Sequence, residues 1–223
     1  MLNMRSSDDR STAARIRDAA ITEFATSGVN GTTVRAIAAA ADVSPGLVIH
    51  HFGSKDQLRV ACDEYVAALI RDVKGEAMTS GAPFDIVGAF RSIGHIPAAK
   101  YLARTLIDGS PHVAELVDEI ISDAVDYLGG GVAAGTIKPT EFEQERAAIL
   151  AIWGLGALVM HEHVERALGV DITADFSTNP EAITAYVRPV FELYSQGLLT
   201  DQAAHAMSEA LDSVSTETET KTP

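Results

Sequence analysis

A pair of short helical patterns separated by a tight turn, between residues 33 and 52, limits the possible folds more than any other feature. The first pattern has apolar residues at the spacing of one helix face: Val34, Ile37, Ala38 and Ala41. A second helix should begin at Ser44-Pro45, because a serine oxygen can accept hydrogen bonds from the first helical N–H groups and proline suits the first turn. Two short helices joined in this way predict a helix-turn-helix, whose second helix enters the major groove of DNA.

Further helices are predicted on both sides of this pair. The helix before it should run from Ser11 to Ser27 and end at Gly28. The helix after it should follow Ser54 and Gln57, which have the spacing of a capping box, and should connect this unit to the rest of the chain. Periodic, alanine-rich segments continue toward the C-terminus, and no alternating strand-like runs interrupt them. The sequence therefore predicts an all-α protein.

The stretch from Arg15 to Leu58 carries a pattern longer than the helix-turn-helix alone. Its parts are a helix ending at Phe24 and Gly28, then residues 32–38, 41–44 and 51–58. On these residues the chain resembles the DNA-binding domain of the tetracycline-repressor (TetR) family of transcriptional regulators. Two positions depart from the family pattern: Asp42 replaces the usual glycine of the turn, and Ile49 stands where a phosphate-contacting tyrosine is usual. Asp is among the few residues that adopt left-handed backbone geometry, so the turn should still form.

The resemblance implies an N-terminal three-helix helix-turn-helix DNA-binding domain followed by a larger C-terminal helical domain for ligand binding and dimerisation. The expected boundaries are a flexible arm at 1–10, the DNA-binding domain at 11–55, the larger domain at 56–211 and a disordered tail at 212–223. The implied function is that of a homodimeric repressor that binds a palindromic operator on double-stranded DNA and is released by a small-molecule effector. Three alternatives stay open: a ligand-dependent activator, a regulator that binds DNA only with its ligand, and a helical enzyme.

Base contacts are expected from the exposed side of the second helix, and phosphate contacts from residues around it. The residues that we expect to face the bases are Pro45, Gly46, Leu47 and His50. The expected phosphate contacts, besides helix N-terminal amides, are Thr33, Ser44 and Lys55. Arg35 could reach either, and His51 could face DNA or the core. Val48 and Phe52 should pack in the core.

The overall charge gives little support for DNA binding, because the formal net charge of the chain is −14. The acidic residues are unevenly distributed, however. Residues 1–55 contain six Lys and Arg against five Asp and Glu, whereas residues 56–223 contain eleven against twenty-six. Repulsion between DNA and the acidic remainder would help to orient the N-terminal end toward the duplex.

Polar and aromatic residues scattered among the apolar helices of the larger domain are candidates for a ligand pocket, which usually combines apolar walls with a few polar groups. They are His95, Tyr101, Arg104, His112, Trp153, Met160 and His161. Each of them could instead be an ordinary packing residue. The resemblance implies a pocket between residues 94–107, 111–128 and 141–165, for an unknown effector that is at least partly apolar.

Two segments of the larger domain are candidates for a subunit interface. Residues 147–160 form a helix that is apolar all round, and a second apolar helix follows Asn179 and contains Pro189, which should bend it. Close packing and a large buried area are expected from Gly154, Ala157, Val187, Phe191 and Tyr194. Both helices could instead fill the core of one subunit. The resemblance implies that they pair with their symmetry mates as a four-helix bundle.

Other classes of protein find little support in the sequence. Cys62 is the single cysteine, so an intrachain disulfide is excluded. The first residues lack the apolar core of a secretory signal, and the longest apolar run, 147–160, is shorter than the ~20 residues that span a bilayer. His161 and His163 are two apart on a helix and point in different directions, which argues against a shared metal ion. We therefore expect a cytoplasmic protein that is not an enzyme and has no membrane partner, cofactor or metal.

Overall fold

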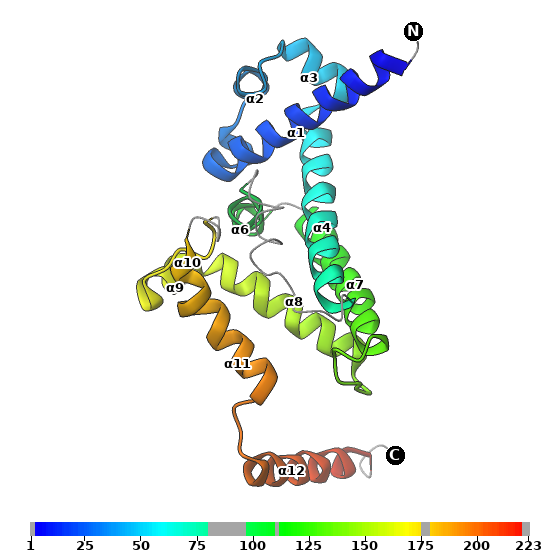
Figure 1. Ribbon diagram of the computed structural model, residues 1–223, viewed down its shortest axis with the longest axis vertical. Coiled ribbons are helices and arrows are strands. Elements are labelled where there is room, and N and C mark those ends of the chain that lie inside the picture. The colour runs from blue at the N-terminus through cyan, green and yellow to red at the C-terminus, as the bar shows by residue number, and fades with distance from the viewer. Residues whose placement is uncertain (1–2, 80–96, 110–111, 175–178, 220–223) are drawn as a thin grey trace.

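The computed structural model describes residues 3–79, 97–109, 112–174 and 179–219, and every element in these ranges is a helix (Figure 1). The helices are α1 (Asn3–Gly31), α2 (Val34–Ala40), α3 (Pro45–Phe52), α4 (Lys55–Thr79), α6 (Ala98–Asp108), α7 (His112–Ala133), α8 (Glu143–Val159), α9 (His161–Leu168), α10 (Pro180–Ala182), the π-helix η1 (Ile183–Val187), α11 (Arg188–Gln196) and α12 (Asp201–Glu219). The predicted all-α class is therefore confirmed.

The head of the molecule consists of α1, α2 and α3, which pack around one apolar core. The large, fully buried side chains of this core are Ile16, Ile21, Phe24, Ile37, Val48 and Leu58. Leu58 belongs to the beginning of α4, so α4 is anchored in the head. In Figure 1, α4 then leaves the head and runs beside α7, with which it makes an extensive contact. This helix therefore connects the head to the rest of the molecule, as the sequence predicted.

The first helix differs from its predicted limits. It begins at Asn3, inside the stretch predicted to be a flexible arm, and continues to Gly31. Gly28, the predicted end, interrupts it, since its φ of 70° and ψ of 165° are not helical. Such a positive φ favours glycine, and a Cβ at this position would lie 3.1 Å from the Arg104 guanidinium of α6. Gly28 thus permits a close approach between α1 and α6.

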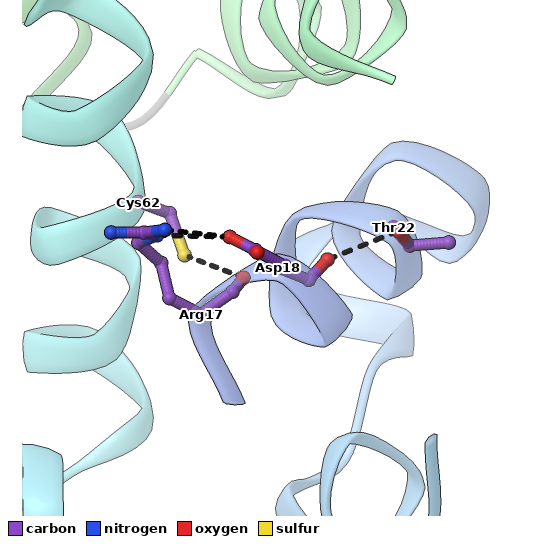
Figure 2. Close-up of polar contacts among 4 residues, drawn as sticks. All are labelled: Arg17, Asp18, Thr22 and Cys62. Atoms are coloured by element: carbon purple, nitrogen blue, oxygen red, sulfur yellow. Dashed lines mark hydrogen bonds and ion pairs between the residues drawn. The ribbon is translucent and has the colours of Figure 1, made fainter. Parts of the chain in front are cut away.

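The contact between α1 and α4 centres on Arg17 (Figure 2). The guanidinium of Arg17 donates hydrogen bonds of 3.1 and 2.8 Å to Asp18, and the Cys62 thiol of α4 donates to the Arg17 carbonyl oxygen at 3.8 Å. The guanidinium carbon also lies 3.3 Å from the centre of the Tyr65 ring on α4. Cation–π contacts and charge-assisted hydrogen bonds stabilise packed surfaces. Arg17 of α1 therefore contributes directly to the contact with α4, through its guanidinium and its carbonyl oxygen.

The body of the molecule is built by α6, α7 and α8 around the far half of α4. The buried apolar side chains at its centre include Leu102, Leu116, Ile120, Ala124, Leu128 and Ala147. Helix α7 packs on both α4 and α8, whereas α6 packs on both α1 and α8. Two helices, α4 and α6, therefore connect the head to the body.

Two features of the C-terminal helices bear on the prediction: the helical geometry changes near Pro189, and the last helix is longer than predicted. The backbone changes to π-helical geometry over η1, immediately before α11, which contains Pro189 near its start. Proline has no N–H to donate to the carbonyl four residues earlier, so a change of helical geometry at this point is expected. Helix α12 extends to Glu219 and so occupies most of the stretch predicted to be a disordered tail.

Within the described ranges, no single helix is both long enough and apolar enough to cross a membrane. Helices α8 and α9 would reach that length and composition only together, and they are bent by 75° where they meet.

Candidate functional site

Both short helices of the head are held at their starts by local hydrogen bonds. Ser44 is the N-cap of α3, and its hydroxyl oxygen accepts a hydrogen bond from the Leu47 N–H at 3.2 Å. Thr33 caps α2 in the same way through the Ala36 N–H, at 3.1 Å. Each cap satisfies an N–H group that the first helical turn leaves free, and is worth about 1 kcal/mol. Because each hydroxyl acts as an acceptor here, its own hydrogen can still bind a phosphate oxygen.

The turn between α2 and α3 depends on Asp42. Its φ is 54°, in the left-handed region, where no other non-glycine residue of the described ranges lies. The short side chains of Asp and Asn tolerate this conformation better than other residues do. The prediction that Asp42 can replace a glycine in this turn is therefore confirmed.

The two sides of α3 have different surroundings. Val48 is buried in the head core and Phe52 packs against that core, as predicted. On the other side, Pro45, Gly46 and His50 are exposed, and Leu47 is half-buried. Figure 1 shows α2 and α3 at the end of the molecule opposite α12. The side of α3 that carries these predicted base contacts is therefore accessible to a large partner.

Lys55, a predicted phosphate contact, already has partners inside the head. Its Nζ donates hydrogen bonds to the carbonyl oxygens of Val29 and Thr32, at 2.9 and 3.1 Å. These two carbonyls lie at the end of α1 and just before α2, so Lys55 ties this junction to the start of α4. An ammonium group has three N–H donors, which leaves one for a phosphate.

The remaining predicted DNA contacts, together with Ile49, lie around this face. Arg35 is exposed in the first turn of α2, and Ile49 is exposed on α3. His51 is half-buried, with its ring 5.6 Å from that of His50 and 6.3 Å from that of Phe52. His51 thus lies at the boundary between the exposed face and the core.

A buried polar link joins the head to the body. The Tyr101 hydroxyl of α6 donates a 2.6 Å hydrogen bond to Asp63 Oδ1 of α4, and Arg59 Nε lies 3.5 Å from Asp63 Oδ2. Tyr101 is fully buried, and its ring lies 6.4 Å from that of Phe24 in α1. Burial raises the pKa of Asp63, against the opposing effects of the Tyr101 hydrogen bond and the Arg59 charge. This link therefore connects three helices at the head–body junction.

The body contains a cavity of about 850 Å³. Its walls come mainly from α4, α6, α7 and α8 and from residues 171–174 and 186–187, and Thr22 of α1 also contributes. Its large apolar lining residues are Leu69, Ile70, Leu102, Ile120, Leu155 and Leu158. Small-molecule sites usually have volumes of about 300–1,000 Å³ and mostly apolar walls, so this cavity has the size and character of a ligand site.

Few polar groups reach the cavity. Lys74, Lys100 and Tyr127 line it from α4, α6 and α7, and burial raises the pKa of Tyr127 to about 12, so its phenol stays protonated. Asp171 accepts hydrogen bonds from the Thr173 N–H and hydroxyl, at 2.8 and 2.6 Å. Burial would raise the pKa of Asp171, but these hydrogen bonds leave it lowered. Across the described ranges, no three His, Cys, Asp or Glu side chains converge to hold a metal ion.

The structure does not bring the predicted ligand-binding residues together at this cavity. Tyr101 is committed to the link with Asp63. Arg104 forms an ion pair with Asp108 at 3.4 Å, and His112 lies 3.2 Å from a Glu115 oxygen. Trp153 and Met160 are exposed on the outside of α8 and at its end, and His161 is half-buried on α9. None of these six residues lines the cavity, and His95 lies outside the described residues.

Sequence reasoning missed the polar residues that do line the cavity. A signal was available for Lys74, because it continues the spacing of Val66 and Ile70 on α4, and an ammonium in line with apolar residues is unusual. For Tyr127 and Asp171, no sequence feature distinguishes a cavity residue from a packing or surface residue.

The predicted interface residues fall into two groups. Phe191 and Tyr194 of α11 are 66% and 59% exposed. Gly154, Ala157 and Val187 instead line the cavity, although no neighbour lies within 4 Å of a Cβ built on Gly154. Trp153, which was assigned to the ligand pocket, is 63% exposed and lies on the same helix as the exposed Ile149 and Ile152.

Comparison with protein families gives two matches that together cover most of the chain. The family described as bacterial regulatory proteins, tetR family, matches residues 16–62. The family described as tetracyclin repressor-like, C-terminal domain, matches residues 94–200. The first match contains α2, α3 and the start of α4, and the second contains most of the body.

Individual proteins agree with these matches. The HTH-type transcriptional regulatory protein RaaS of Mycobacterium tuberculosis is 41% identical over 209 residues, which are 91% of this chain and 93% of RaaS. An HTH-type transcriptional repressor of the same organism is 37% identical over 139 residues, 58% of this chain and 70% of that protein. Both relatives are transcriptional regulators.

Two solved structures show the same fold at low sequence identity. A TetR transcriptional regulator from Chloroflexus aurantiacus has a TM-score of 0.54 and 22% identity, covering 85% of this chain and 98% of that one. Salmonella enterica GusR has a TM-score of 0.52 and 21% identity, covering 84% and 95%.

Proposed function

The chain belongs to the TetR family of DNA-binding transcriptional regulators, and we propose that it acts as a cytoplasmic, homodimeric repressor that is released from a palindromic operator by a small molecule. The observation that carries this proposal is the accessible face of α3, with Pro45, Gly46 and His50 exposed opposite the buried Val48. A helix anchored on one side and open on the other can enter the major groove.

The support for a dimer is the exposed apolar surface of α8 and α11. Its large exposed side chains are Ile149, Ile152, Trp153, Phe191, Leu193 and Tyr194. Apolar side chains that gather at the surface of a soluble protein usually mark an interface. A two-fold dimer would set its two α3 helices to read half-sites about 34–36 Å apart, which is one turn of DNA.

The support for release by a small molecule is the position of the cavity relative to the head. Helix α6 lines the cavity with Ala99 and Leu102, and the hydroxyl of Tyr101, which lies between them in the sequence, donates a hydrogen bond to Asp63 of α4. A ligand that displaces α6 would therefore act on α4, and through it on α3. A coupling free energy of about 1–3 kcal/mol would change DNA affinity by about 5- to 150-fold.

Selection of duplexes from a random pool tests the DNA part of this proposal. We expect a palindromic site and, by analytical ultracentrifugation, two copies of the chain per duplex. His50→Ala should weaken binding to the selected site or change its sequence, whereas His205→Ala, an exposed histidine on α12, should do neither. A protein that stays monomeric and prefers no duplex at low ionic strength would refute the proposal.

Transcription in vitro from a promoter that contains the selected site tests repression and release. The protein alone should lower transcript yield, and a small-molecule fraction of cell extract should restore it. An increase of transcription by the protein alone would identify an activator, and a requirement for the extract would identify a regulator that binds DNA with its ligand.

A further inference from the structure

The cavity contains an ammonium group that lacks a counter-ion. Lys74 lines the cavity from α4, and in the part of the chain that the structure describes it makes no ion pair or hydrogen bond. Its nearest aromatic neighbour is Tyr127, whose ring centre lies 5.6 Å from the Nζ atom. Lys74 is an exposed residue of α4 that lines the cavity, and desolvation by the surrounding protein atoms lowers its pKa. A charged group with these surroundings is more stable when an anion joins it.

Two acidic residues of the body, Asp123 and Asp171, have partners other than Lys74. Asp123 of α7 accepts hydrogen bonds of 3.2 Å from Arg71 on both carboxylate oxygens. Asp171, on another wall of the cavity, accepts both of its hydrogen bonds from Thr173. Neither carboxylate forms an ion pair with Lys74, so its ammonium group is available to a bound anion.

Much of the remaining wall is apolar. Leu69 and Ile70 precede Lys74 on α4, and Ile120, Leu155 and Leu158 contribute from α7 and α8. Tyr127 keeps its proton at neutral pH, so its hydroxyl is able to donate to an anion as well. The cavity therefore combines two lysines, Lys74 and Lys100, with a large apolar wall, and Lys74 is the lysine whose Nζ lies near the Tyr127 ring.

We propose that the cavity takes an apolar organic anion, with the acidic group of the ligand on Lys74 Nζ and its hydrocarbon part along Ile120, Leu155 and Leu158. This assignment rests on the proposed function in one respect, namely that the effector binds in this cavity. It excludes cationic ligands and gives neutral apolar molecules a lower affinity. Lys74 then distinguishes ligands by charge, while the apolar wall sets how tightly they bind.

Binding of three probes with the same ten-carbon chain tests the charge preference directly, by calorimetry on the full-length protein without DNA and below the concentrations at which the probes form micelles. Decanoate should bind at least about tenfold more tightly than 1-decanol, the difference expected for a hydrogen bond to a charged group, and decylamine should bind least. Equal affinities for decanoate and decanol, or no binding of any probe, would overturn the proposal.

Substitutions at Lys74 identify the group responsible. Lys74→Met should reduce the affinity for decanoate to that for decanol and leave the affinity for decanol unchanged, and Lys74→Arg should retain the preference. Lys138→Met, an exposed lysine outside the cavity, serves as the matched control and should behave like the unaltered protein. A decanoate preference that persists in Lys74→Met would refute the assignment. Circular dichroism verifies that each variant is folded.

A separate titration on labelled operator DNA distinguishes this proposal from the proposed function. Should decanoate bind through Lys74 without releasing DNA, the ligand assignment stands and release by a cavity ligand is refuted. Should neutral or cationic molecules release DNA while decanoate shows no preference in calorimetry, the repressor proposal stands and the assignment to anions is refuted.

Discussion

Gly46 is the second residue of α3, and a Cβ at this position would meet only the Ser44 hydroxyl oxygen, at 3.9 Å. The head itself therefore does not require glycine here. We expect Gly46→Ala to leave the free energy of unfolding unchanged or to raise it by up to about 1 kcal/mol, because alanine favours helix. If the α3 backbone approaches the bases at this residue, the added methyl group should weaken DNA binding by about 1–3 kcal/mol.

Chemical denaturation and fluorescence anisotropy on the selected duplex measure these two effects of Gly46→Ala. Gly75→Ala is the matched control, since Gly75 is a helical glycine of α4 whose Cβ would meet no atom within 4 Å. It should affect stability in the same direction and leave DNA affinity unchanged. An unaltered affinity in Gly46→Ala would show that the backbone does not approach the DNA there.

Lys55 has two roles that a single substitution can separate. Lys55→Met removes the hydrogen bonds to the Val29 and Thr32 carbonyls, and we expect it to lower the free energy of unfolding by about 1–3 kcal/mol, since it leaves half-buried acceptors without a donor. If the third N–H also contacts a phosphate, the slope of log affinity against log salt concentration should fall by about one. A loss of stability with an unaltered salt slope would assign Lys55 to the structure of the head alone.

At the scale of helices, the hydrogen bond between Tyr101 of α6 and Asp63 of α4 can be tested directly by substitution. Tyr101→Phe keeps the buried ring but leaves Asp63 Oδ1 without its donor, so we expect a loss of about 1–3 kcal/mol in the free energy of unfolding. DNA affinity without effector should change little, because the α3 face is untouched, whereas the release of DNA by an active extract fraction should weaken.

The double variant Tyr101→Phe with Asp63→Asn provides the control for this link. Residues in direct contact give non-additive effects on stability, so the loss in the double variant should differ from the sum of the two single losses. Additive losses would mean that the hydrogen bond contributes little, and an unaltered release of DNA in Tyr101→Phe would show that the signal travels by another route.

Elements with strong local signals could be predicted from the sequence. Ser44 and Asp42 determine the start of α3 and the turn before it through their own backbone and side-chain chemistry, so both were predictable. The far end of the chain was less predictable, because residues 212–219 contain a single apolar residue, Val214, whereas α12 as observed extends through them. The cavity could not be predicted, since apolar stripes on α4, α7 and α8 do not indicate which residues leave space between helices. Trp153 was assigned to the pocket for this reason, although it lies on the outer side of α8.

At the scale of the whole molecule, the exposed side chains of α8 and α11 predict the assembly. Phe191→Asp places a charge in the proposed interface, and we expect it to convert the dimer to a monomer and to abolish operator binding. Gln202→Asp on α12 introduces the same charge away from α8 and α11 and should leave the dimer intact. Sedimentation velocity measures both, and a dimer that persists in Phe191→Asp would place the interface elsewhere.

The burial of Cys62 in the contact between α1 and α4 makes the native protein nearly inert to thiol reagents, since its side chain is inaccessible and burial raises the pKa of its thiol. A cysteine introduced at the exposed His50 would therefore take a spin label without any background from Cys62. Each subunit would then report the position of its own α3, and pulsed dipolar spectroscopy could measure the spacing of the two helices with and without effector.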